Sequence, residues 1–217
     1  VVAGGADAIL TSYGIARNFA EELDGVGLIL RSDGASSNLG SPSTGSTGSF
    51  FGPDDAVQVG ADALVVTALP GSDKEDMTLE NLARTASAAH AIGVPMLGEM
   101  VPGGFDSPPE RRGTEAVAFA ARLGAELGAD FIKAPYCADY AKVTSSTFVP
   151  VVILGGSKTS EADMLTDIRS ALDSGAAGVA IGRNVFQAPD PTAMTAAIVT
   201  LVHDDVSVDQ ALAVLKG

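Results

Sequence analysis

Short apolar runs recur along the chain, and longer segments with helical spacing of apolar residues separate them. The runs predict strands at 8–10, 26–30, 63–66, 95–97, 131–133, 151–154 and 179–181. The intervening segments predict helices, most clearly at 77–91, 114–127, 161–172, 193–202 and 207–215. Strands that alternate with helices of this length are typical of parallel βαβ units in an α/β protein.

A small glycine motif comes directly before four of these strands. Gly5, Gly60 and Gly128 each open a Gly-Ala-Asp tripeptide, and Gly175 opens a related Gly-Ala-Ala. Most of these motifs also follow a helical segment. A glycine at this position suits the left-handed conformation that ends a helix, so the motif marks the passage from helix to strand.

The strand count predicts a TIM (β/α)8 barrel, in which inward-facing side chains alternate between odd and even strands. Seven strands of two alternating kinds are visible, and the first of them begins only a few residues into the chain. By this alternation, the strand that is missing is the first one of the barrel. We therefore expect residues 1–217 to form a single TIM-barrel domain that lacks its first strand.

Composition and charge narrow the choice of partners. The chain has 217 residues and a net charge of −14 at pH 7, which argues against nucleic acid or an anionic membrane surface as partner. A single cysteine, Cys137, excludes an intrachain disulfide and fits a reducing cytoplasm. No apolar run reaches the roughly 18 residues that span a bilayer, and no signal peptide is visible. Clustered His and Cys spacing is also absent, so we expect neither a metal nor another cofactor.

One of the five lysines lies in a strand that contains no other charge. Lys133 follows Phe131 and Ile132 and precedes Ala134. Desolvation disfavours the charged form of an amine, and a neutral amine is a nucleophile suited to Schiff-base chemistry with a carbonyl substrate. The alternative interpretation is a lysine at a strand end that reaches solvent or an ion-pair partner.

Two glycine-marked strand ends lie near the C-terminus. The first carries Gly155, Gly156 and Lys158, and the second carries Gly182 and Arg183. TIM barrels commonly bind phosphate after their last two strands, where glycines let backbone amides approach the anion. Arg183 and Lys158 would supply positive charge in an otherwise acidic protein. The alternative is that both stretches are plain turns.

An acidic residue is embedded in the apolar strand that precedes the strand of Lys133. Glu99 and Val101 share one face of this strand, because side chains alternate. If that face looks into the barrel, Glu99 lies beside Lys133. A partly buried carboxyl there would have a raised pKa and could transfer protons. The alternatives are a solvated strand end or an ion pair with Arg31, which ends an earlier strand and is itself a candidate for substrate binding.

A low-complexity stretch at 40–49, rich in Gly, Ser and Thr, follows the strand at 26–30. Its position predicts a loop on the catalytic face of a barrel. A flexible surface loop without chemistry is an equally open interpretation.

Several of these stretches resemble the class I aldolases of the DeoC/FbaB/LacD family. The stretches are Gly128–Lys133 with Tyr136, Gly155–Thr159 and Gly182–Gln187, with agreement at Gly14–Arg17 and Pro70–Ser72. The family branch includes archaeal-type fructose-bisphosphate aldolases, aminodideoxyheptulosonate synthases and autoinducer-2 thiolases. The resemblance implies a Schiff base on Lys133, and a phosphate site at Gly155, Gly156, Gly182 and Arg183. It also implies a homo-oligomer, with a decamer among the expected assemblies.

The chain departs from the family pattern in two places. An aspartate that takes part in catalysis usually ends the first strand, and that strand is missing here. A tyrosine that transfers protons in the archaeal fructose-bisphosphate aldolases is replaced by Val101. This replacement makes Glu99, two residues earlier on the same face, the candidate acid–base group.

We therefore expect a lyase that cleaves or forms a carbon–carbon bond in a phosphorylated ketose, in the manner of fructose-bisphosphate aldolase. One alternative is an enzyme that transfers an acyl or sugar-acid unit, as in the thiolase and heptulosonate branches. The other alternative is a barrel that binds sugar phosphates without catalysis.

Overall fold

The computed structural model describes residues 1–34, 47–156 and 159–216. In this part of the chain seven parallel strands form one sheet, and each strand pairs with the next in sequence order. The strands are β1 (Ala8–Thr11), β2 (Gly27–Arg31), β3 (Ala63–Ala68), β4 (Met96–Met100), β5 (Phe131–Pro135), β6 (Val151–Leu154) and β7 (Gly178–Ala180). All seven predicted strands are therefore confirmed.

The helices alternate with the strands. They are α1 (Tyr13–Asn18), α2 (Pro53–Val59), α3 (Glu75–His90), α4 (Thr114–Glu126), α5 (Tyr140–Ser146), α6 (Glu161–Asp173), α7 (Arg183–Phe186), α8 (Pro191–His203) and α9 (Val208–Val214), with short 3-10 helices η1 (Val2–Gly4) and η3 (Pro109–Arg112). Two of the predicted starts have side-chain caps: Ser160 accepts a hydrogen bond from the amide of Asp163, and Ser207 forms a reciprocal capping box with Gln210.

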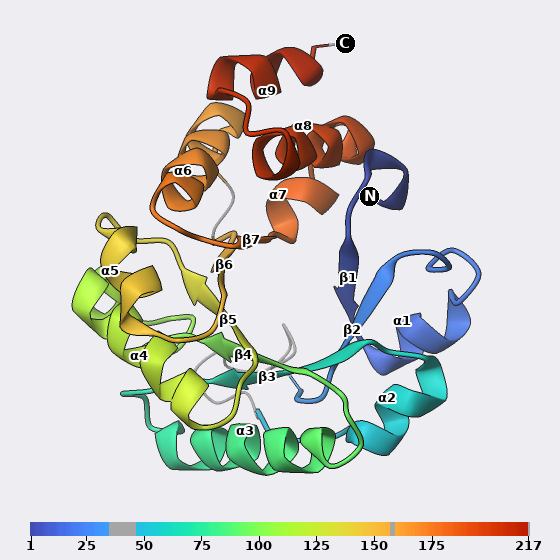
Figure 1. Cartoon of the computed structure of the whole chain (residues 1–217), viewed down its shortest axis with the longest axis vertical. Coiled ribbons are helices and arrows are strands. Elements are labelled where there is room, and N and C mark those ends of the chain that lie inside the picture. The colour runs from blue at the N-terminus through green and yellow to red at the C-terminus, as the bar shows by residue number, and fades with distance from the viewer. Residues whose placement is uncertain (35–46, 157–158, 217) are drawn as a thin grey trace.

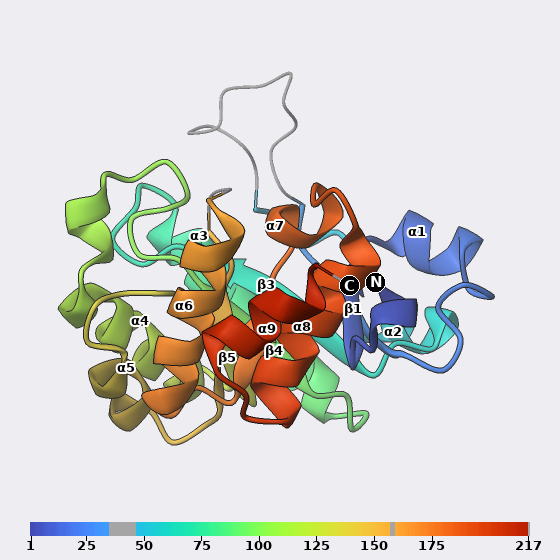
Figure 2. The same ribbon diagram turned by 90° about the horizontal axis from the view of Figure 1, so that it is seen from above.

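The sheet curls into an arc, and the longer helices pack around its outer side (Figure 1). Strands β1 and β7 stand at the two ends of this arc, and among the described residues they do not pair with each other. The arrangement confirms the predicted α/β fold of the TIM-barrel type. Figure 2 shows the same molecule from above, with α7 and the loop after β4 at the same end of the sheet.

The glycine motif ends helices or turns as the sequence predicts. Gly5, Gly60, Gly128 and Gly175 all adopt positive φ angles, of 90°, 68°, 103° and 89°. L-residues with a side chain rarely adopt such angles, whereas glycine does so without a steric cost. Each of these residues therefore turns the chain from one element into the strand that follows.

The main apolar core lies between the sheet and the helices. Val66, Met100 and Ile132 are fully buried in it and come from three neighbouring strands. Helix α4 approaches this layer closely, because a Cβ atom at Gly124 would lie 2.8 Å from Ile132 and from Met100. This close packing fixes the positions of β4 and β5, the two strands that carry the candidate catalytic residues.

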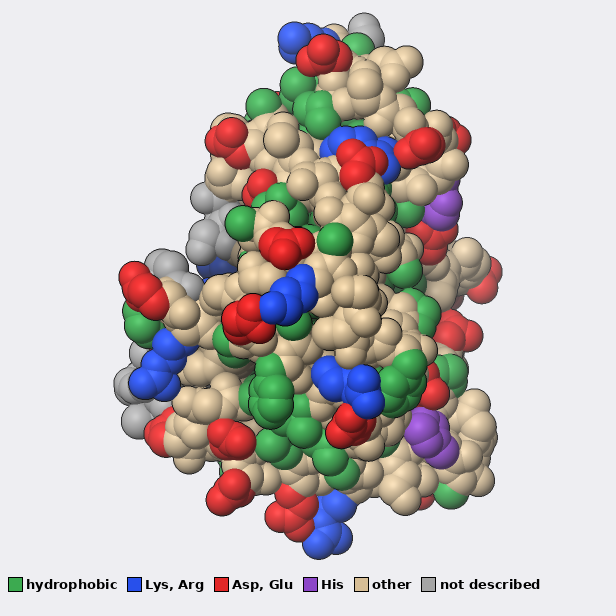
Figure 3. Space-filling view, turned by 60° about the vertical axis from the view of Figure 1, so that its left-hand side comes forward, with side chains coloured by type: hydrophobic (Ala, Val, Ile, Leu, Met, Phe, Trp, Pro, Cys, Tyr) green, Lys and Arg blue, Asp and Glu red, His purple; other side chains and the backbone are tan. Residues whose placement is uncertain are grey.

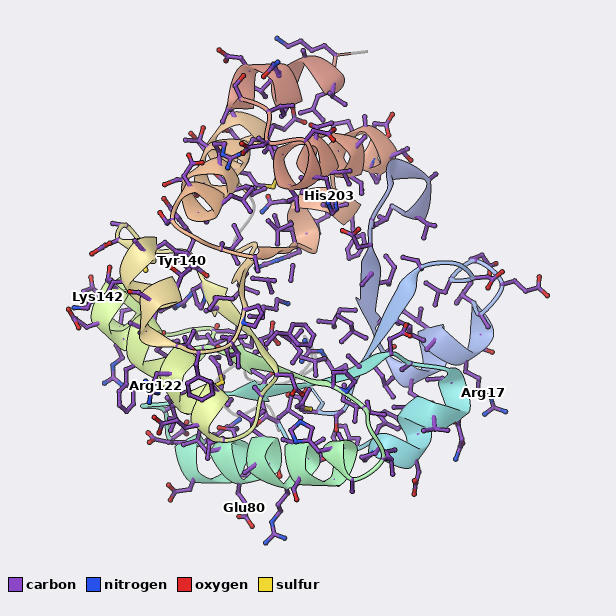
Figure 4. The ribbon with its side chains drawn as sticks, in the orientation of Figure 1. Arg17, Glu80, Arg122, Tyr140, Lys142 and His203 are labelled. Atoms are coloured by element: carbon purple, nitrogen blue, oxygen red, sulfur yellow. The ribbon has the colours of Figure 1, made fainter. Side chains whose placement is uncertain are left out.

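Pairing between the strands sets three polar residues at one level. Thr67 of β3 is the register partner of Glu99 in β4, and Glu99 is the partner of Lys133 in β5. Register partners in neighbouring strands point to the same side of the sheet. Ile132, next to Lys133, belongs to the outer core, so this row of three side chains faces the inside of the arc. Figure 4 shows strand side chains filling the arc, whereas Arg17, Glu80 and Lys142 point outward.

Candidate active site

Lys133 lies on the inner side of the arc, as the sequence predicts for a Schiff-base lysine. The residue is only 8% exposed. Its Nζ lies 2.8 Å from Oε1 of Glu99 on the neighbouring strand. The buried amine is therefore held against a carboxylate. The predicted placement of Glu99 beside Lys133 is confirmed by this contact.

Glu99 is the centre of the polar cluster. The residue is 3% exposed, and its second oxygen, Oε2, accepts hydrogen bonds from Arg31 Nη2 at 2.8 Å and from Thr67 Oγ1 at 2.9 Å. Together with the contact to Lys133, both carboxylate oxygens are occupied. The ion pair with Arg31, which the sequence left as an alternative, is thus present together with the pair to Lys133.

The prediction of a raised pKa for Glu99 is wrong. Burial alone does raise the pKa of this carboxyl, as the sequence argument assumed. The opposing charges of Lys133 and Arg31 and their hydrogen bonds outweigh the burial and lower the pKa to about 2. Glu99 is therefore ionised at neutral pH and acts as a hydrogen-bond acceptor in the resting site.

Arg31 is held from two sides. Its Nη1 donates to Asp33 Oδ1 at 2.9 Å and to Thr67 Oγ1 at 2.8 Å, while Nη2 contacts Glu99. Burial lowers the pKa of Arg31, but the charges of Glu99 and Asp33 outweigh it, so the pKa is raised and the residue stays cationic. Direct binding of substrate by Arg31 remains a prediction.

Sequence reasoning missed Asp33 and Thr67. Asp33 is 4% exposed and accepts a hydrogen bond from the backbone amide of Thr67 at 3.0 Å. Burial, with the charge of Glu99 acting in the same direction, raises its pKa despite Arg31. Thr67 had a signal similar to that of Lys133, since it is the one polar residue in the apolar run from Ala63 to Ala68.

The predicted phosphate loops lie next to each other at the ends of β6 and β7. Arg183 Nη2 donates to the carbonyl oxygen of Gly156 at 3.2 Å. A Cβ atom on Gly155 would lie 2.9 Å from the side chain of Ile181, so only glycine fits there. Gly182 is the N-cap residue of α7. Lys158 lies outside the described residues.

Asn184 joins these two loops and was also missed. Its Nδ2 donates to the Gly155 carbonyl at 2.9 Å, and its Oδ1 accepts from the backbone amide of Thr159 at 3.2 Å. The residue is 6% exposed. Its position one residue after Gly182-Arg183 gave no separate signal, because an asparagine at a helix start is common.

Two cavities border the Lys133–Glu99 pair, one at each residue. The first, of about 450 Å³, is largely apolar; Lys133 and Gly182 line it, together with Ile9, Phe131 and Val152. The second, of about 580 Å³, is lined by Glu99, Arg31 and the loops that follow β3 and β4. Lys133 therefore borders the first cavity and Glu99 the second.

Among the residues described, no group of three or more His, Cys, Asp or Glu side chains stands close enough to hold a metal ion. None of the helices described is both long and apolar enough to cross a membrane.

A family model and known proteins match this chain. The model of the DeoC/LacD family aldolases matches residues 1–188. The 2-amino-3,7-dideoxy-D-threo-hept-6-ulosonate synthase of Halobacterium salinarum is 39% identical over 218 residues, which cover 98% of this chain and 80% of that protein. The 2-amino-4,5-dihydroxy-6-oxo-7-(phosphonooxy)heptanoate synthase of Streptomyces griseus is 40% identical over 157 residues, or 70% of this chain and 56% of that protein.

A solved structure is also similar. It is an archaeal fructose-1,6-bisphosphate aldolase with its catalytic lysine covalently bound to the carbinolamine intermediate of the substrate. The TM-score is 0.82 and the sequence identity 33%, with 93% of this chain and 80% of that chain covered.

Proposed function

The chain belongs to the DeoC/LacD aldolase family, and on this premise we propose that it makes or breaks a carbon–carbon bond through an imine on Lys133. The observation that carries the proposal is the buried Lys133 amine, which lines the same cavity as Gly182 of the predicted phosphate loops. A ketone whose phosphate binds at Gly182 and Arg183 would bring its carbonyl carbon to the amine.

The reaction would proceed in balanced steps. The Lys133 amine adds to the ketone carbon, water leaves, and a protonated imine forms. In the cleavage direction, the bond breaks between the carbon next to the imine carbon and the hydroxyl-bearing carbon that follows it. The electron pair of this bond moves toward the imine, and an enamine remains. The hydroxyl of the departing fragment loses its proton and becomes an aldehyde. Protonation of the enamine carbon and addition of water then release the ketone and restore the amine.

Glu99 fits the proton transfer of this sequence despite its low pKa in the resting state. The ammonium and the protonated imine carry the same charge, so Glu99 stabilises both. When the imine becomes a neutral enamine, that positive charge disappears and the pKa of Glu99 rises. The carboxylate then becomes a better proton acceptor at the step where the substrate hydroxyl must lose its proton.

Two substrate classes have support from the similar proteins. The identities of 39% and 40% to synthases of amino sugar acids favour a seven-carbon keto-amino acid. The 33% identity to the archaeal fructose-1,6-bisphosphate aldolase favours a ketose bisphosphate. Val101 stands where the resemblance leads us to expect a tyrosine in that aldolase branch, so we favour the keto-amino acid and keep the bisphosphate as the second candidate.

Borohydride trapping tests the imine. The protein is incubated with dihydroxyacetone phosphate, reduced, digested and mapped by mass spectrometry. We expect one adduct, on Lys133. Dihydroxyacetone without the phosphate should label the same residue far less efficiently, and Arg183→Gln should remove most of this difference. Arg17→Gln, an exposed arginine on α1, serves as the control for loss of charge.

The substrate candidates are separated by assays of cleavage. Release of glyceraldehyde 3-phosphate from fructose 1,6-bisphosphate would support the bisphosphate, whereas cleavage of the heptanoate that the Streptomyces relative makes would support the keto-amino acid. A protein that binds dihydroxyacetone phosphate but gives no adduct at Lys133 would instead be a binding protein for sugar phosphates without catalysis.

A further inference from the structure

Two positive charges without acidic partners line the second cavity. Elsewhere Arg84 pairs with Glu80 and Arg122 with Glu126, whereas among the described residues Arg17, Arg112, Arg183 and Lys216 are in no ion pair. Within the described part of the chain, Lys74 and Arg111 have no such partner, and both line the cavity beside Glu99. In a protein of net charge −14, unpaired cations at one cavity indicate a place for an anion.

Arg111 is held in place, although it is exposed. Its Nη1 donates to the carbonyl oxygen of Gly71 at 3.1 Å, so it joins the loop after β4 to the loop after β3. A Cβ atom at Gly103 would lie 3.2 Å from Cδ of Arg111, so the side chain lies against this glycine. The remaining N–H groups of the guanidinium can bind a planar anion through a bidentate pair of hydrogen bonds.

A buried hydroxyl in the same wall has no partner. Thr47 lines the cavity and is 8% exposed, and its Oγ1 makes no hydrogen bond with the residues described. Its backbone is held, since Asn81 Nδ2 donates to the Thr47 carbonyl at 3.0 Å. A buried polar atom without a partner is costly, and rotation of this hydroxyl toward the cavity would let a ligand oxygen satisfy it.

The acidic residues that line the second cavity do not cancel its preference for an anion. Asp33 and Glu99 already bind Arg31, and Glu99 also binds Lys133. Asp73 and Asp106 are exposed, where water and salt screen their charges.

We propose that Lys74, Arg111 and Thr47 bind the anionic end of the substrate that lies farthest from the ketone. The proposal rests on the proposed function and extends it. The heptanoate of the Streptomyces relative and the bisphosphate both have this form: a phosphate next to the ketone, and a second anionic group at the other end of the carbon chain. That second group is a carboxylate in the heptanoate and a phosphate in the bisphosphate. The first cavity holds the phosphate and the ketone, and the second cavity selects the aldehyde fragment by its charge.

Bond formation between dihydroxyacetone phosphate and three aldehydes tests this site. Glyceraldehyde 3-phosphate carries a phosphate, succinic semialdehyde carries a carboxylate, and glyceraldehyde is uncharged. We expect Lys74→Gln and Arg111→Gln each to raise the KM of the preferred charged aldehyde by about tenfold or more. The KM of glyceraldehyde and the trapping at Lys133 should not change. The charged aldehyde that responds identifies the anion as phosphate or carboxylate.

Two further variants test which groups are responsible for the effect. Arg84→Gln removes an arginine of α3 that is paired with Glu80, and it should leave all three aldehydes unaffected. Thr47→Val removes the hydroxyl but keeps the shape. We expect this variant to have a raised KM for the charged aldehydes. An unchanged KM would mean that the hydroxyl does not contact the anion.

The outcomes separate this proposal from the proposed function. Absence of any adduct at Lys133 would overturn the imine mechanism. The anion site would then be tested alone, by calorimetric titration with succinate and with glyceraldehyde 3-phosphate, and loss of binding in Lys74→Gln and Arg111→Gln would uphold it. Equal responses of the charged and uncharged aldehydes, or normal binding by both variants, would overturn the anion site.

Discussion

Glu99 and Lys133 are register partners on adjacent strands, and their side chains meet at 2.8 Å inside the arc of the sheet. The contact joins the two residues that the sequence selected independently. It also changes the chemistry expected of Glu99, because the positive charges of Lys133 and Arg31 lower the pKa of its carboxyl and keep it ionised.

Lys133→Met should abolish both borohydride trapping and turnover, because no other described lysine lines the cavity that holds it. The fold should remain, since Glu99 keeps its contacts with Arg31 and Thr67 and the methionine replaces a buried cation by an apolar chain. Mass mapping and circular dichroism provide the measurements. Lys142→Met, which replaces an exposed lysine of α5, is the matched control and should keep full activity. Trapping that persists in Lys133→Met would place the imine elsewhere.

Glu99→Gln should reduce turnover by about two to three orders of magnitude, because an amide cannot accept the proton of the substrate hydroxyl. Trapping should change little, since the carboxylate stabilises the ammonium and the protonated imine alike. Steady-state rates and adduct yields, measured on the same preparation, separate the two steps. Full turnover in this variant would show that Glu99 has only a structural role, whereas loss of trapping would assign it to imine formation.

Asn184→Ala should weaken the binding of phosphorylated ketones without a large change in kcat. The variant removes the hydrogen bonds to the Gly155 carbonyl and the Thr159 amide, and so loosens the two loops proposed to bind phosphate. We expect KM to rise by about thirtyfold, since two bonds are lost and each contributes roughly 1 kcal/mol. The control is Asn18→Ala, whose side chain bonds only within the region of α1. A fall in kcat at unchanged KM would contradict this role.

The sequence predicted the architecture well because its signals are local. The glycines at 5, 60, 128 and 175 marked the turns into strands, and their positive φ angles confirm the interpretation. Lys133 and Glu99 were found for a similar reason, since each is a charged residue in an apolar strand. Such a residue stands out without any knowledge of its neighbours.

The electrostatics of the site could not be predicted in the same way. The pKa of Glu99 depends on Lys133, 34 residues away, and on Arg31, 68 residues away. Burial alone predicts a raised pKa for Glu99, which is the wrong direction, because neither partner charge is visible as a neighbour in the sequence. Asp33 was missed because its role appears only when Arg31 and Thr67 are brought together. Pairing between strands sets these contacts, and strand register is not visible in a single sequence.

The homo-oligomer expected from the sequence remains a prediction, and the structure offers a surface for it. Phe119 of α4 and Phe148 are each 66% exposed, and the guanidinium of Arg122 lies 5.3 Å from the ring centre of Phe148. Figure 3 shows hydrophobic side chains beside Lys and Arg on the side where α4 and α5 lie. Exposed apolar groups of this kind favour contact with another protein surface.

Sedimentation tests this prediction. The protein should sediment as an oligomer at micromolar concentration, and the double variant Phe119→Ser, Phe148→Ser should shift it toward smaller species. Phe19→Ser, which removes an exposed ring beside α1, is the matched control. A stable monomer of the unmodified protein would contradict the prediction of an oligomer, and an unchanged assembly in the double variant would place the contact elsewhere.

The low pKa of Glu99 should make the stability of the fold depend on pH in a specific window. Its pKa is lowered from 4.5 to about 2, so the ionised carboxylate stabilises the folded state fully above pH 4.5, and this contribution is lost as the pH falls through about 2. The full contribution is on the order of 3 kcal/mol.

Chemical denaturation of the protein and of Glu99→Gln at pH 6.5 and 3.5 measures this contribution. The difference in free energy of unfolding between the two should shrink at the lower pH, by an amount on the order of 1 kcal/mol. Glu126→Gln, on the exposed side of α4, controls for the general loss of one negative charge. A difference that stays constant with pH would mean that Lys133 and Arg31 do not hold Glu99 in its ionised form.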